Sequence, residues 1–377
     1  MKKRVFLDNA ATTPIAPEII ELISDMMKTH FANPSSIHSY GRESKIVVEN
    51  ARKTIANLLN TSPGSIFFTS GGTEADNMAI KCAIQDHKIK HAITSKLSHH
   101  AVLYPLEDLA SENKIKLSYI DIDKNGVISL SHLEKLLLNN ERTFVSIMHA
   151  NNEIGTIQPL KDIGDICKQY NAIFHSDTVQ TMAHYSFDMQ ELNVDFMAAS
   201  AHKFHGPKGI GFVYISEDIQ INPLLRGGGQ ERNMRAGTEN IYGIAAMAKA
   251  MEMAYENLEE ETNYIKGLKK YMIYKLKSEI EDVQFYGKCT DLEESLYTVL
   301  SCNFPENKNS EMLMFNLDIK GVACSGGSAC SSGSSKGSHV LTALDPESSR
   351  PGVRFSFSKY NTKEDIDFAI DQLKELV

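Results

Sequence analysis

Short apolar runs and amphipathic segments alternate along most of the chain. Runs rich in β-branched and aromatic residues predict strands at 65–69, 91–95, 116–122, 144–148, 172–175, 196–199 and 209–215. Apolar residues at helical spacing predict helices before or between them, at 17–27, 44–59, 75–85, 133–138 and 163–169. This alternation predicts an α/β fold in which a mainly parallel sheet carries helices on both faces.

The pattern changes in the last third of the chain. A helical segment over 240–280 is apolar early and strongly charged from Glu256 onward, so we expect it to bend and to bridge two domains. Shorter elements follow, namely strands at 296–303 and 353–357, a helix at 310–317, and a closing helix with Thr362 and Asp365 placed as a capping box. We therefore predict a large domain over 13–259 and a smaller α+β domain made of 1–12 and 260–377.

Composition narrows the classes of protein that fit. The chain has 377 residues, of which 42% are hydrophobic and 23% charged, as in an ordinary globular protein. Its formal net charge of -9 argues against direct nucleic-acid binding. Because it lacks a run of about 20 apolar residues and a signal-peptide pattern, we expect a cytoplasmic protein without a membrane span. Its six cysteines are then expected to be free thiols rather than disulfides.

Polar residues cluster directly after four of the predicted strands, at 98–100, 149–153, 175–180 and 200–203. In parallel sheets, ligands bind at the carboxyl ends of the strands, so these clusters predict one shared site. Lys203 stands out, because a lysine desolvated in such a pocket can lose its proton and form a Schiff base with a carbonyl compound. The alternative is that Lys203 is an ordinary solvated lysine.

A glycine-containing turn at 70–74 leads into a predicted helix. Free backbone N–H groups at such a helix start favour an anion, so the turn is a candidate phosphate site. The alternative is an ordinary helix start with Thr73 as its cap. A second glycine-rich stretch, at 227–238, is basic.

Serine and glycine dominate the stretch 324–337, which also contains Cys324 and Cys330. This composition cannot form a packed core and predicts a mobile loop. An exposed thiol there is open to oxidation, which favours a function for it over a plain linker with incidental cysteines.

Taken together, these motifs resemble the cysteine desulfurases of the NifS/IscS class, which belong to the class V aminotransferases among the fold-type I pyridoxal-phosphate enzymes. The resemblance covers nearly the whole chain, in family order, through the stretches 8–14, 69–77, 146–155, 175–180, 200–209, 227–238, 325–332 and 354–356. It implies a three-layer large domain like that of aspartate aminotransferase and a smaller α+β domain.

The resemblance also implies a cofactor, pyridoxal 5'-phosphate, bound covalently to Lys203. Asp177 would pair with the ring nitrogen, His99 would stack on the ring and move protons, and Asn152 and Gln180 would contact the ring oxygen. The phosphate would be held by Gly72, Thr73, Ser200 and His202, and by Thr238 from the other subunit of a homodimer. Arg354, helped by Asn152, would bind the substrate carboxylate through its planar fork of donors.

The implied reaction uses L-cysteine as substrate and releases L-alanine. Lys203 takes the α proton, and the Cys330 thiolate attacks the substrate sulfur and becomes a persulfide. His99 is the candidate for the base that ionises this thiol, whose ordinary pKa of about 8.5 leaves it mostly protonated. No resident metal is expected, apart from transient contact of Cys330 with iron–sulfur assembly. The acceptor would be an iron–sulfur scaffold protein or a tRNA thiolation pathway.

The sequence departs from the family pattern at a few positions, and alternatives stay open. Ser98 stands where relatives often have an acid, Ala201 replaces a common glycine, and Cys324 is an extra thiol that could relay sulfur, form a disulfide or be a bystander. Within the fold, the alternatives are a selenocysteine lyase, another β-lyase or an aminotransferase. From a different class, the alternative is a non-catalytic scaffold that binds sulfur or metal through Cys324 and Cys330.

Overall fold

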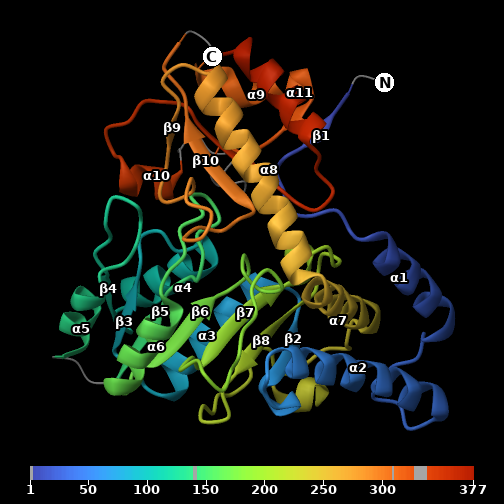
Figure 1. Cartoon of the computed structure of the whole chain (residues 1–377). Helices are drawn as coiled ribbons and strands as arrows, with labels where there is room; N and C mark the ends of the chain where they lie inside the picture. Colours follow the sequence, from blue (N-terminus) through green and yellow to red (C-terminus); the bar gives the residue numbers. More distant parts are fainter. Residues whose placement is uncertain (1–2, 139–141, 308–309, 327–337) are drawn as a thin grey trace.

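A computed structural model describes residues 3–138, 142–307, 310–326 and 338–377. Its centre is a seven-stranded sheet in the order β2-β8-β7-β6-β5-β3-β4 (Figure 1). The strands are β2 (Ile66–Thr69), β3 (His91–Thr94), β4 (Lys116–Tyr119), β5 (Thr143–Ser146), β6 (Ile173–Asp177), β7 (Phe196–Ser200) and β8 (Gly211–Ile215). Every pairing is parallel except those of β8, which runs antiparallel to both neighbours. The predicted mainly parallel sheet is confirmed.

Helices cover both faces of this sheet and make three layers. They are α1 (Pro17–Thr29), α2 (Ser39–Leu58), α3 (Gly72–Asp86), α4 (His100–Ser111), α5 (Leu130–Leu138), α6 (Leu160–Gln169) and α7 (Ile241–Glu256). Neighbouring strand residues point to opposite faces, so Phe68 packs in the core with α2, α6 and α7, while Phe67 packs in the core with α3 and α4. Because both faces are covered, six of the seven strands are buried along their whole length, whereas the edge strand β4 is partly exposed.

The C-terminal third builds a second, smaller sheet above the first (Figure 1). The chain reaches it through α8 (Leu258–Glu279), which is separated from α7 by a break at Asn257, so the predicted bend is confirmed. Three antiparallel strands follow, β9 (Gln284–Phe285), β10 (Val299–Asn303) and β12 (Gly352–Ser356), with helices α9 (Leu313–Lys320), α10 (His339–Leu344) and α11 (Lys363–Lys374). The predicted capping box at Thr362 and Asp365 is present at the start of α11.

The N-terminal residues join this second region rather than the first. Strand β1 (Val5–Phe6) pairs in parallel with β11 (Val322–Ala323), and Val5 and Leu7 are buried in the same apolar cluster as α8, β10 and α11. This packing supports the division that we propose, in which residues 1–12 belong to the smaller domain.

Two local features differ from the sequence-based expectation. The cap of α3 is Gly71, with φ 152°, and Thr73 lies inside the helix, so the interpretation of Thr73 as the cap is wrong. Helix α4 was not predicted, because Pro105 and two histidines obscure its apolar spacing. In the part of the chain that the structure covers, no helix is both long and apolar enough to span a bilayer.

Candidate active site

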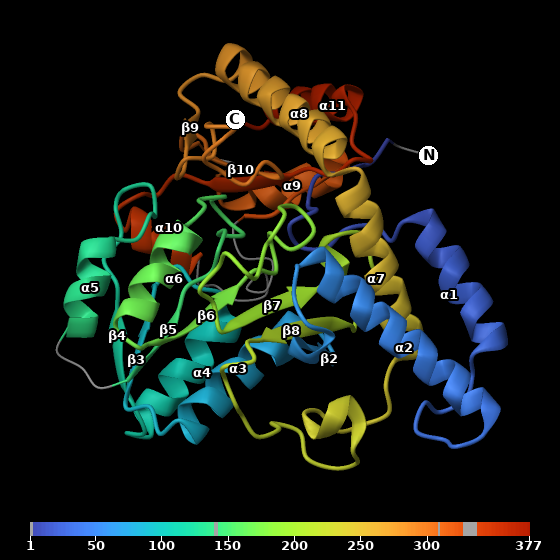
Figure 2. The same ribbon diagram turned by 60° about the horizontal axis from the view of Figure 1, so that its bottom comes forward.

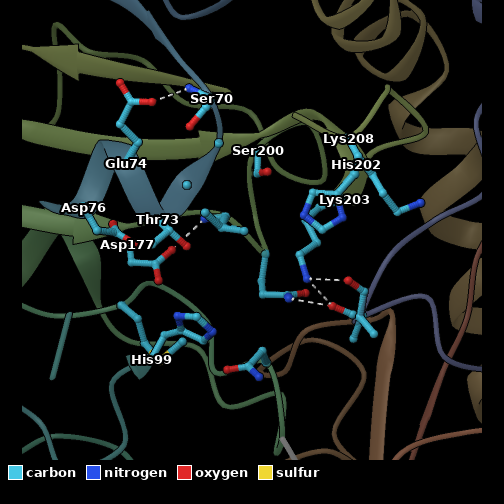
Figure 3. A pocket seen from close by; sticks show the side chains of 18 of the residues that line it. Ser70, Thr73, Glu74, Asp76, His99, Asp177, Ser200, His202, Lys203 and Lys208 are labelled. Atoms are coloured by element: carbon cyan, nitrogen blue, oxygen red, sulfur yellow. Dashed lines mark hydrogen bonds between the residues drawn. The ribbon is translucent and has the colours of Figure 1, made fainter. Parts of the chain in front are cut away.

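A cavity of about 380 Å³ lies where the carboxyl ends of β6 and β7, the start of α3 and strand β12 meet (Figure 3). Its walls include ten of the twelve predicted site residues, namely Gly72, Thr73, His99, Asn152, Asp177, Gln180, Ser200, His202, Lys203 and Arg354. These residues come from stretches that lie far apart in the sequence. The fold brings the polar stretches that follow the strands to one cavity, as the sequence predicts.

Lys203 ends the short 3-10 turn Ala201–Lys203 that follows β7. Its Nζ donates hydrogen bonds to the backbone carbonyls of Ala10, at 2.6 Å, and Ala11, at 3.0 Å. The Gln180 amide donates to the same Ala10 carbonyl at 3.0 Å. The N-terminal segment therefore forms one wall of the cavity and holds the lysine amine against it, as Figure 3 shows.

Asp177, at the end of β6, faces the cavity from the opposite side. One of its carboxylate oxygens accepts the Val179 N–H at 3.0 Å. Burial raises the pKa of Asp177, although His99, this backbone N–H and Lys203 all favour its charged form. A cationic ring nitrogen in the cavity would offset that burial cost, so the side chain suits such a partner.

Asp76 is a second acid of the cavity wall, and the sequence analysis missed it. It is buried, and burial together with the nearby Asp177 raises its pKa well above the ordinary value. Its carboxylate lies 3.2 Å from Nε2 of the buried His175. The available signal was its position four residues after Gly72, which places both on one face of α3.

The start of α3 forms an anion cradle. A Cβ added at Gly72 would lie 2.5 Å from the Val179 side chain, so only glycine fits there. Gly71 has no side chain with which to cap the first backbone N–H groups of the helix, and the dipole of α3 favours negative charge at this end. The carboxylate of Glu74, in the first turn, accepts hydrogen bonds from the Ser70 N–H and from Arg235, at 2.8 Å each. The hydroxyl groups of Thr73 and Ser200 and the imidazole of His202 complete a donor set that fits a phosphoryl group.

Arg354 projects from β12 and is only 1% exposed. Its Nη1 donates to the Asn152 carbonyl at 2.9 Å, and its Nη2 donates to Asp8 at 2.8 Å. Its Nε is buried and has no hydrogen-bond partner among the described residues. A guanidinium with an unused donor beside a cavity suits a ligand carboxylate.

His99 caps α4, and its Nδ1 accepts the Ala101 N–H at 3.1 Å. Burial is the main cause that lowers its pKa. Lys203, His100 and His339 lower it further, while Asp177 opposes the shift. Figure 3 shows the His99 ring beside Asp177 at the cavity.

Two predicted site residues remain, Thr238 and Cys330. Thr238 lines a separate cavity of about 190 Å³, together with Arg235 and Glu239. Cys330 falls in the stretch 327–337, outside the described residues. Cys324 is partly buried, and burial raises its pKa, which keeps it a protonated thiol. Across 3–138, 142–307, 310–326 and 338–377, no three His, Cys, Asp or Glu side chains are arranged to hold a metal ion.

Comparisons with known proteins agree with the fold. A family model described as Aminotransferase class-V matches residues 5–368. The chain is 42% identical over 391 residues to a protein of Dictyoglomus turgidum named cysteine desulfurase IscS, with all of this chain and 95% of that protein covered. Among solved structures, a NifS-like protein shares 36% identity at a TM-score of 0.90, with 99% of both chains covered.

A second solved structure, titled SspA in complex with cysteine, shares 29% identity at a TM-score of 0.80 and covers 95% of this chain and 100% of that one. The family model and the relative of Dictyoglomus turgidum both extend over nearly the full length of the chain, including every element that lines the cavity. The chain therefore belongs to the aminotransferase class-V family.

Proposed function

We propose that this protein is a cysteine desulfurase that converts L-cysteine to L-alanine and passes the sulfur to an acceptor through a persulfide on Cys330. The observation that carries the proposal is the combination, in one cavity, of Lys203, an anion cradle and a buried arginine with an unused donor. Full-length relatives named cysteine desulfurase support this activity over the other reactions of the fold.

The cavity residues fit pyridoxal 5'-phosphate, which we propose as the cofactor. Gly72, Thr73, Ser200 and His202 would hold its phosphate, and Lys203 would bind it covalently. Asp177 would meet the ring nitrogen, and Gln180 and Asn152 would meet the ring oxygen. When bound, this cofactor supplies an electron sink for the charge left when a substrate Cα loses a proton.

The chain's own residues would position the substrate and move its protons. Arg354, whose side chain lines the cavity, would bind the carboxylate of L-cysteine through its guanidinium, a charge-assisted contact that fixes the amino acid in one orientation. The Lys203 amine, once free, is the base that takes the α proton. The role of Cys330 as the sulfur acceptor rests on its sequence context, because it lies outside the described residues.

We also propose a homodimer, in which the partner's copy of Thr238 completes the phosphate site. Figure 2 shows α1, α2 and α7 together along one side of the molecule. The first two of these helices and their connection carry a group of exposed apolar side chains, Ile20, Met27, Phe31, Ile37, Tyr40 and Ile46. Exposed apolar surface of this kind favours burial against a second copy. Sedimentation should give a dimer, and Ile37→Asp, at a side chain that is 92% exposed, should weaken it.

The experiment that tests the activity starts from the absorbance of the purified protein after addition of pyridoxal phosphate. A bound, yellow cofactor that disappears in Lys203→Ala, together with alanine release from L-cysteine, supports the proposal. Cys330→Ala should keep the bound cofactor but lose sulfur transfer. An aminotransferase or a sulfide-releasing lyase would keep turning over in Cys330→Ala, and a non-catalytic scaffold would stay colourless.

A further inference from the structure

A histidine outside the cavity, His184, joins the main chain of Lys203 to the second, smaller region of the fold. It lies in the turns that follow β6, and its ring contacts one group at each nitrogen. Nε2 is 3.1 Å from the backbone carbonyl oxygen of Lys203, and Nδ1 is 2.9 Å from the hydroxyl of Tyr297. Tyr297 is 2% exposed and packs in the apolar cluster that contains α8, β10 and α11. One imidazole ring therefore ties the lysine backbone to that cluster.

The two partners determine which nitrogen of His184 carries the proton. A carbonyl oxygen only accepts hydrogen bonds, so Nε2 must hold the proton that it donates to Lys203. Burial raises the pKa of Tyr297, so its hydroxyl keeps its proton and can donate to Nδ1. Burial also lowers the pKa of His184, and Lys359 lowers it further, while the contact with the Lys203 carbonyl opposes the shift. His205 faces the ring as well, and a charge on either imidazole disfavours one on the other.

The backbone that presents His184 is strained. Ala183, directly before it, has a φ of 63°, in the left-handed region that a residue with a Cβ seldom adopts. The N–H groups of His184 and Tyr185 both donate to the Thr181 carbonyl, at 2.9 and 3.0 Å, and hold this tight turn closed. Strain of this kind persists where the surroundings hold it and is concentrated at functional positions. Here the strained turn places the ring between the Lys203 carbonyl and the smaller region.

We propose that His184 is a positioning residue for Lys203, which fixes the lysine backbone through Nε2–H and couples it through Tyr297 to the smaller domain. At its other end, the lysine amine is held by the carbonyls of Ala10 and Ala11. The amine must leave those carbonyls to react, whereas the backbone has to stay in place, because a small displacement of a reacting group slows a reaction strongly. The role rests on the proposed function of Lys203, whereas the hydrogen bonds of His184 do not.

Two substitutions separate the contributions of the two ring nitrogens. The amide nitrogen of His184→Gln reaches about as far as Nε2 and keeps a donor for the Lys203 carbonyl. The side chain of His184→Asn is one methylene shorter and reaches only about as far as Nδ1, so it loses that contact. His91→Asn is the matched control. His91 is 5% exposed, contacts hydroxyl groups of the neighbouring strands at 2.9 and 3.4 Å, and does not line the cavity.

The main readout is the yellow absorbance that forms when pyridoxal phosphate is added to the full-length protein stripped of cofactor. We expect its rate of appearance to fall about two- to tenfold in His184→Asn, the effect of one lost hydrogen bond. His184→Gln and His91→Asn should stay within about twofold of the unsubstituted protein, because both keep the contact with Lys203. The kcat for L-cysteine should follow the same order with KM unchanged. Equal losses in His184→Gln and His184→Asn, or no loss in either, would refute the positioning role.

Tyr297→Phe tests the link to the smaller domain and covers the case in which His184→Asn does not fold. It removes one hydroxyl and leaves the ring donor in place, so we expect a fall of about threefold or less in the same rate. An unchanged rate would refute the link through Tyr297.

The protonation of His184 is measured in the protein without cofactor, labelled with ¹⁵N at its histidine rings. Long-range ¹H–¹⁵N spectra distinguish the two neutral tautomers, and the His184 signals are those that vanish in His184→Gln. We expect the Nε2–H tautomer, and an Nδ1–H tautomer would overturn the proposal. If the unsubstituted protein bound no pyridoxal phosphate, the proposed function would be contradicted instead, and the spectra would still show whether His184 donates to the Lys203 carbonyl.

Discussion

Two arginines are almost completely buried in this protein, and their donors are used differently. Arg52, in α2, forms a bidentate pair with Glu231 through Nη1 at 2.9 Å and Nη2 at 2.8 Å. Arg354, in β12, makes one contact with Asp8 and one with the Asn152 carbonyl, and its Nε is left without a partner among the described residues. Arg52 therefore forms a complete ion pair, whereas Arg354 still has a donor that could bind another group.

The Arg52 pair has a structural task. Glu231 begins a run of three residues with left-handed φ angles, 45°, 55° and 66° at Glu231, Arg232 and Asn233. Such a run is strained, and it persists only where its surroundings hold it. The second oxygen of Glu231 also accepts the Phe68 N–H at 2.8 Å, so the pair ties the glycine-rich loop to β2 beneath the anion cradle.

The unpaired donor of Arg354 lowers the stability of the fold, a loss that a purely structural arginine would avoid. A buried donor without a partner destabilises a protein by about 1 to 3 kcal/mol. Its ion-pair partner Asp8 is 19% exposed, so part of that carboxylate remains hydrated. The difference teaches that burial alone does not identify a functional arginine, and that incomplete pairing of an arginine that lines a cavity makes it a candidate.

The largest expected effect is on stability, at Arg52. Arg52→Met should lower the free energy of unfolding by about 3 to 5 kcal/mol, because it leaves the charge of Glu231 buried and unpaired. Urea unfolding followed by circular dichroism measures this. The double variant Arg52→Met with Glu231→Leu should recover much of the loss. If the single variant lost less than about 1 kcal/mol, the ion pair of Arg52 with Glu231 would not be what holds the glycine-rich loop against β2.

The next effect is on activity, at Arg354. Arg354→Gln should lower kcat/KM for L-cysteine by about a hundredfold, equivalent to about 3 kcal/mol, because the substrate carboxylate loses its charged partner. Its melting temperature should change little. The matched control is Arg350→Gln, which loses an ion pair of 2.8 Å with Asp282 away from the cavity and should keep normal kinetics. Equal kinetic losses in both variants would remove the distinction between the two arginines.

Asp195 extends the comparison to a buried carboxylate that has no arginine partner of this kind. Its hydrogen bond comes from a backbone N–H instead of a guanidinium. It accepts the Phe174 N–H at 2.7 Å, and burial is the main cause that raises its pKa to about 6. Between its unfolded pKa of about 3.9 and this value the folded state binds more protons, so stability falls as pH rises. We expect a decrease of about 2 kcal/mol across that window, measured by urea unfolding. Asp195→Asn should flatten the slope, and an unchanged slope would contradict the assignment.

The seven strands of the large sheet and the cluster around Lys203 could be predicted from sequence, because both depend on local patterns. Apolar runs mark the strands, and polar residues follow directly where each strand ends. The family resemblance then identified ten residues that the fold does bring to one cavity. The sequence pattern also predicted α11, because both residues of its capping box lie within one stretch of four residues.

The remaining features depend on contacts between distant residues. Asp8 meets Arg354 across 346 positions, and the carbonyls of Ala10 and Ala11 meet Lys203 across 193 and 192 positions. No periodicity encodes such contacts. The cap formed by His99 was hidden for a different reason, since histidine is an uncommon cap and Pro105 interrupts the helical pattern after it.

The smallest effect is expected at Asp8, which also accepts the Ser325 hydroxyl at 2.8 Å. Asp8→Asn keeps an acceptor for both Arg354 and Ser325 but removes the negative charge that competes with the substrate carboxylate. We expect the KM for L-cysteine to fall about threefold, as suits a partly hydrated ion pair worth less than about 1 kcal/mol. Asp8→Ala, which removes both contacts, should instead raise KM, because it frees Arg354 to leave its position. If Asp8→Asn also raised KM, the charge of Asp8 would be needed to hold the guanidinium in place, and Arg354 would be a fixed ion pair like Arg52.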